Sequence, residues 1–95
     1  MLNEKGHINI KEDIVLREEE DGAFLFNPNT GRICYLNDLG TIIWRLCDKS
    51  KTPEKMISKI CSDYPEVSQE QISQDCLQFL TDLEKMEFIS LKPEN

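Results

Sequence analysis

Two turn signals separated by five residues constrain this chain more than any other feature. Asp21-Gly22 and the tetrapeptide at 28–31 bracket the short apolar segment AFLFN. Aspartate and glycine suit the positive φ of a type I′ hairpin turn, and proline presets the φ of the second turn. We therefore expect three strands, at residues 14–19, 23–27 and 32–36, which pair in chain order as an antiparallel meander.

The third strand, from Arg32 to Leu36, is the last strand of that meander. Its outer N–H and C=O groups have no partner strand in this arrangement, and an unpaired edge can template another chain. Asn37 follows at once and is a good helix N-cap. We interpret this edge as the binding site of the protein, because it can accept a second peptide as an added strand.

Three amphipathic helices follow the strands. Apolar residues recur at helical spacing from Leu39 to Cys47, from Met56 to Tyr64 and from Ile72 to Met86. Each helix has a residue at its start whose side chain can accept a backbone hydrogen bond. These predicted N-caps are Asn37, Thr52 and Ser68. The predicted fold class is α+β, with a three-stranded meander followed by three α-helices in a winged helix-turn-helix-like arrangement.

One domain accounts for nearly the whole chain of 95 residues. We expect it to span residues 13–91, with a flexible N-terminal tail at 1–12 and a C-terminal tail at 92–95. The alternation in HINIK is also compatible with a strand, and EFISL near the end is compatible with either a short strand or a packed tail.

Charge and hydropathy exclude several classes of partner. The net charge of −7 argues against nucleic acid and against an anionic membrane surface, both of which attract basic proteins. The apolar runs are far shorter than the ~20 residues that span a bilayer, and residues 1–11 contain no apolar signal core. We therefore expect a cytoplasmic protein that attracts a basic peptide or a partner with a basic face.

The sequence contains few groups with catalytic or metal-binding potential. Cys34, Cys47, Cys61 and Cys76 form no C-x-x-C pair, which favours buried thiols in a reducing compartment over a zinc site or a disulfide framework. His7 is the only histidine and lies in the expected tail. No glycine-rich phosphate loop is present. We expect no catalytic residue, no metal and no cofactor, and therefore a binding module instead of an enzyme.

We expect the third helix to form one wall of a peptide-binding groove and the third strand to form the other. If it packs beside the third strand, backbone hydrogen bonds line one wall of a groove and apolar side chains line the other. We expect pockets formed by Ile33, Tyr35, Phe79 and Met86 to select the peptide side chains.

The chain also resembles the PqqD-like family of small peptide chaperones, the recognition elements for precursors of ribosomally synthesised, modified peptides. The resemblance covers residues 14–90. It is carried by the hairpin, by LN-x-x-G-x-x-I-W from Leu36 to Trp44, by a helix start at Thr52, and by D-x-x-x-F-L-x-x-L from Asp75 to Leu83.

The resemblance implies a winged helix-turn-helix-like fold that binds the leader segment of a precursor peptide. The leader would add as an antiparallel strand to the third strand and pack against the third helix. The implied contacts are Arg32, Ile33, Cys34, Tyr35, Leu36, Asp75, Phe79, Asp82 and Met86. The implied partner is a modifying enzyme, such as a radical SAM protein or the leader peptidase of a lasso-peptide pathway. The family name points to pyrroloquinoline quinone (PQQ) biosynthesis, without specifying the product that this chain serves.

Two other hypotheses follow from the same residues. Three helices with a β-hairpin are the parts of a winged-helix nucleic-acid-binding protein, although the acidic flank of the third helix is unfavourable for a recognition helix. A small enzyme or metal protein would have to use the cysteines. The open strand edge allows either a monomer or a weak dimer.

Overall fold

The structure, a computed structural model, describes residues 6–50 and 52–92 and contains two small sheets and three helices within that part of the chain. The elements, in order, are β1 (His7–Ile10), β2 (Val15–Glu19), β3 (Gly22–Asn27), β4 (Arg32–Leu36), α1 (Asp38–Ser50), α2 (Pro53–Asp63), α3 (Gln69–Lys85) and β5 (Ile89–Lys92). The expected α+β architecture is confirmed, because three meander strands precede three helices.

The three-stranded sheet has the expected antiparallel order β2-β3-β4. Its second turn forms as predicted: Gly31 has a φ of +76° and its N–H donates to the carbonyl of Asn27 at 2.8 Å. The first turn differs from the predicted type I′ turn. Gly22 pairs with Glu19 as the first residue of β3, so the two loop residues are Glu20 and Asp21. Among the residues of this turn, only Gly22 has a positive φ.

The three helices begin at the predicted caps. The Asn37 side chain accepts a hydrogen bond from the Gly40 N–H at 2.7 Å. Thr52 and Ser68 accept in the same way from residues three positions later. These bonds satisfy N–H groups that have no partner within the helix. Because only a few residue types can accept them, the start of each helix could be predicted from the sequence.

The N-terminal segment differs from the expected flexible tail at residues 7–10. These residues form β1, which pairs antiparallel with β5, and Ile8 is only 3% exposed. The alternation in HINIK is compatible with either a strand or a loose tail, and the sequence did not decide between them because the partner strand lies about 80 residues away along the chain. Residues 1–5 of the expected N-terminal tail and residues 93–95 of the expected C-terminal tail lie outside the described residues. Lys92, which we expected to begin the C-terminal tail, is the last residue of β5.

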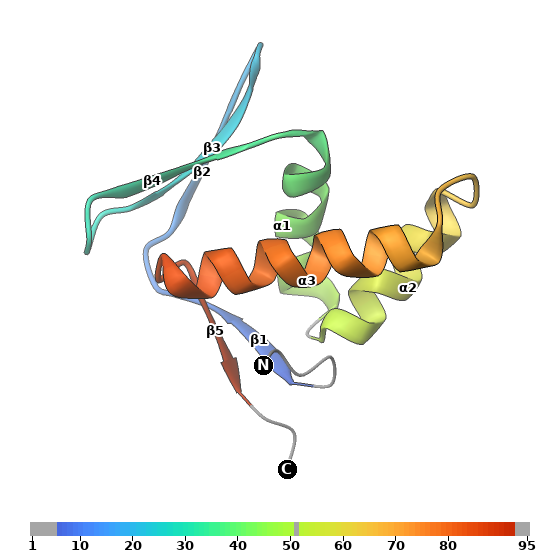
Figure 1. Ribbon diagram of the computed structural model, residues 1–95. Helices are drawn as coiled ribbons and strands as arrows, with labels where there is room; N and C mark the ends of the chain where they lie inside the picture. Colours follow the sequence, from blue (N-terminus) through green and yellow to red (C-terminus); the bar gives the residue numbers. More distant parts are fainter. Residues whose placement is uncertain (1–5, 51, 93–95) are drawn as a thin grey trace.

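Helix α3 lies between the two sheets, with β2-β3-β4 on one side and the β1-β5 ribbon on the other (Figure 1). The core is formed where the inner face of the three-stranded sheet, the three helices and the ribbon meet. Its fully buried side chains include Leu25, Ile43, Met56, Ile60, Leu80, Leu83, Phe88 and Ile89. No helix in the described part of the chain is long and apolar enough to span a membrane.

Candidate functional site

Strand β4 has one open edge. It pairs with β3 along its whole length, and no other described strand pairs with it. The strands nearest the two chain ends pair with each other and leave this edge uncovered. The backbone groups along the outer edge of β4 are therefore available to an added strand.

The two faces of β4 have different surroundings. Cys34 is half-buried and Leu36 is buried, whereas Ile33 is 48% exposed and Tyr35 is 79% exposed on the opposite face. Successive side chains of a strand alternate between faces. Ile33 and Tyr35 therefore do not share a pocket with Phe79, and our expectation of such a pocket is wrong for these two residues.

Helix α3 faces the same side of β4 as Cys34. Burial raises the pKa of the Cys34 thiol, and the nearby carboxylate of Asp82 raises it further because a second negative charge disfavours the thiolate. Asp82 of α3 is therefore within electrostatic range of Cys34, the middle residue of β4.

A hollow of about 320 Å³ lies where α3 meets the start of α1. Its lining residues are Asn37, Leu39, Gly40, Ile43, Asp75, Gln78, Phe79 and Asp82. The structure thus brings together three of the predicted helix residues, Asp75, Phe79 and Asp82. Met86, the fourth, is half-buried against the core and does not line this hollow.

The hollow combines an apolar floor with acidic side chains. The Gln71 amide donates to Asp75 at 2.9 Å and the Gln78 amide donates to Asp82 at 3.0 Å, which restrains both carboxylates along α3. Such a site suits a peptide side chain with an aliphatic stem and a positive end, because the stem contacts apolar surface while the charge stays near carboxylates.

Gly40 is a site residue that the sequence analysis attributed only to close packing. A Cβ at this position would lie 3.3 Å from Phe79 Cζ and 3.5 Å from Leu36 Cδ2. The absence of a side chain at Gly40 therefore lets the first turn of α1 approach both Phe79 of the hollow and Leu36 of β4.

Asn27 is a positioning residue that the sequence analysis missed. Its side-chain amide donates to the carbonyl of Glu87 at 2.8 Å, and its side-chain oxygen accepts from the Asn29 N–H at 2.9 Å. Asn27 thereby connects the β3-β4 turn to the end of α3. Asparagine before a turn is a recognisable signal, but the sequence does not reveal a partner 60 residues away.

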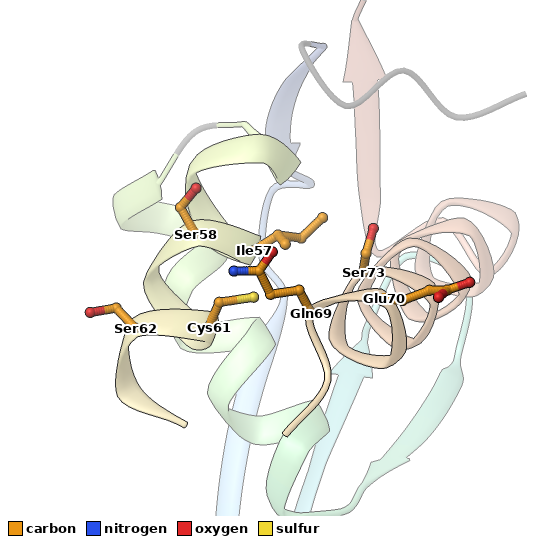
Figure 2. Close-up of a pocket in the computed structure, with 7 residues that line it drawn as sticks. All are labelled: Ile57, Ser58, Cys61, Ser62, Gln69, Glu70 and Ser73. Atoms are coloured by element: carbon orange, nitrogen blue, oxygen red, sulfur yellow. The ribbon is translucent and has the colours of Figure 1, made fainter. Parts of the chain in front are cut away.

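A second hollow, of about 620 Å³, lies between α2 and the start of α3. Figure 2 shows Ile57 and Cys61 of α2 pointing toward α3, with Gln69 and Ser73 on the other side. The single histidine is on β1, outside the lining of this hollow. No cluster of three or more metal-binding side chains occurs among residues 6–50 and 52–92.

Comparison with known proteins gives one family and two similar structures. The profile of the PqqD family, described as coenzyme PQQ synthesis protein D, matches residues 22–89. A solved structure of TbiB1 in complex with the TbiA(beta) leader peptide is 27% identical, with a TM-score of 0.77, and the match covers 90% of this chain and 99% of that one.

The second structure is lasso peptide synthetase B1 complexed with the leader peptide. It has 19% identity and a TM-score of 0.76, with 88% of this chain and 98% of that chain covered, and it supports the fold. No curated protein matches the chain.

Proposed function

Because this chain belongs to the PqqD family, whose profile matches residues 22–89, we propose that it binds the leader segment of a ribosomally synthesised precursor peptide by strand addition to β4. The observation that carries this proposal is the open edge of β4 beside the hollow on α3. A solved structure of similar fold, TbiB1, is in complex with a leader peptide.

The proposed contacts have two kinds of role. The backbone of Arg32 to Leu36 would supply hydrogen bonds that demand little of the leader's sequence. Side chains on the α3 side would select the residues of the leader that face them. These proposed selecting residues are Cys34, Leu36, Asp75, Phe79, Asp82 and Met86.

We assign the chain an adaptor role without catalysis of its own. It would present the bound leader to a modifying enzyme, for which a radical SAM protein and a lasso-peptide leader peptidase are the two candidates. Strand addition holds the leader in an extended conformation, so the segment that follows the leader can reach a second protein.

The direct test is a titration of ¹⁵N-labelled protein with the leader segment of its precursor peptide. We expect the largest amide shifts at Arg32 to Leu36 and along the face of α3 that lines the hollow. Shifts confined to the β2-β3 hairpin would contradict strand addition at β4.

A pair of proline variants tests the role of the backbone. In a strand, the N–H groups of neighbouring residues point to opposite edges, so one of Cys34 and Tyr35 donates toward β3 and the other toward the open edge. Proline has no N–H. We expect one of Cys34→Pro and Tyr35→Pro to disrupt the sheet, and the other to keep the circular dichroism spectrum and lose leader binding. Unchanged leader affinity in the folded variant would refute the proposal.

A further inference from the structure

The face of the three-stranded sheet that points away from the core carries an exposed apolar patch. Cross-strand pairing aligns two rows of side chains on it. We call this surface the outer sheet face, and its residues are Val15, Phe26 and Ile33 in one row and Arg17, Phe24 and Tyr35 in the next. The Phe24 and Tyr35 rings pack with their centroids 6.0 Å apart at an interplanar angle of 55°.

Leader binding as proposed above does not use this surface. The leader would occupy the edge of β4 and the side toward α3, whereas Ile33 and Tyr35 point the other way, and Val15 is 43% exposed on the far strand. A contiguous patch of large apolar side chains on a small protein is a mark of an interaction surface. Tyr35 is exposed and Phe24 and Phe26 are half-buried. Tyrosine and phenylalanine are residue types enriched where proteins bind each other.

A hollow of about 390 Å³ adjoins one end of the outer sheet face. Phe24 and Tyr35 contribute apolar lining, and Glu19 and Asp21 contribute carboxylates. A lysine or arginine from a partner fits this combination, because its stem can lie against the rings while its charge approaches the carboxylates.

Charge distinguishes between the possible protein partners. A second copy of this chain would bring the same acidic hollow and another net charge of −7 to the contact, which opposes self-association. A partner with an apolar surface bordered by basic residues is complementary to both features.

We propose that the outer sheet face docks the modifying enzyme, through an apolar surface of that enzyme bordered by lysine and arginine. This inference rests on the proposed function, since it assumes an enzyme that receives the leader. It places the enzyme and the leader on different faces of β4, so both can bind at once.

The test measures two affinities for each variant: one for the leader peptide, and one for the purified modifying enzyme. Val15→Arg replaces an exposed apolar side chain of the patch with a charged one, on the strand of this sheet farthest from β4. Val67→Arg is the matched control, because Val67 is 41% exposed, against 43% for Val15, and lies in the α2-α3 connection.

We expect the patch variant to bind the enzyme at least tenfold more weakly than wild type and the leader within twofold of wild type. The control should match wild type in both measurements. Glu19→Lys/Asp21→Lys should also weaken enzyme binding and leave leader binding unchanged.

Equal enzyme binding by the patch variant and wild type would overturn the proposal, as would an equal loss in the control. A parallel loss of leader affinity in the patch variant would assign the patch to the leader site instead. Sedimentation of a wild-type dimer that Val15→Arg dissociates would assign the patch to contact with a second copy of this chain. Enzyme binding through the patch without any leader binding would support this inference and refute the proposed function.

Discussion

At the scale of the residue, Asn27 holds the two walls of the candidate groove in position. It is 3% exposed, and both polar atoms of its side chain are hydrogen-bonded. We expect Asn27→Ala to lower the free energy of unfolding by about 1–3 kcal/mol, because it removes both bonds and leaves the Glu87 carbonyl without this donor. Leader affinity should fall as well, since the β3-β4 turn loses its connection to α3.

The matched control is Asn29→Ala in the same turn. Asn29 is exposed, and the Asn29 group that bonds to Asn27 is the backbone N–H, which alanine keeps. Urea unfolding should place this variant within about 0.5 kcal/mol of wild type. Equal destabilisation of the two variants would show that the Asn27 side chain has no special role.

At the scale of the element, the approach of α3 to β4 can be measured through Cys34. The pKa of its thiol is raised by burial and by Asp82, and the thiolate is the reactive form. Iodoacetamide at pH 8 should therefore modify Cys34 more slowly than a solvent-exposed cysteine. Asp82→Asn removes the negative charge, lowers the thiol pKa and should speed the reaction, as read by mass spectrometry of the Cys34 peptide.

Saturating leader peptide should slow modification of Cys34 further, because the added strand would cover it. Cys61 on α2 serves as an internal control: it is half-buried in the hollow between α2 and α3, and its rate should not respond to the leader. A leader that binds without protecting Cys34 would argue against a site between β4 and α3.

At the scale of the whole molecule, the two ends of the described chain meet in the β1-β5 ribbon, across α3 from the three-stranded sheet (Figure 1). Ile8 anchors the ribbon in the core, and the Lys11 N–H donates to the Phe88 carbonyl at 3.0 Å. We expect Ile8→Ala to lower the free energy of unfolding by about 2–5 kcal/mol, as for other buried isoleucines.

His7→Ala is the control for that change, because His7 is the exposed neighbour on the same strand. Thermal unfolding should separate the two variants clearly, while leader affinity, measured where both are folded, should match wild type. Similar midpoints for Ile8→Ala and wild type would mean that the N-terminal strand contributes little to stability.

Interactions between residues close together in the sequence allowed much of this fold to be predicted. The bounds of β4, the turn at Gly31 and the caps at Asn37, Thr52 and Ser68 each depend on residues within about four positions of one another. Asp75, Phe79 and Asp82 are spaced by four and three residues, so the sequence alone predicts that they are neighbours on one surface of α3.

The sequence by itself therefore determined the three-stranded meander with β4 as its last strand and the three helices that follow it. Only the tertiary structure decided which face of β4 meets α3, that Asn27 reaches Glu87, and that the segment at 7–10 is a strand. These features depend on contacts between residues that are distant along the chain. Such contacts form when whole elements pack, and no short-range pattern of residues encodes them.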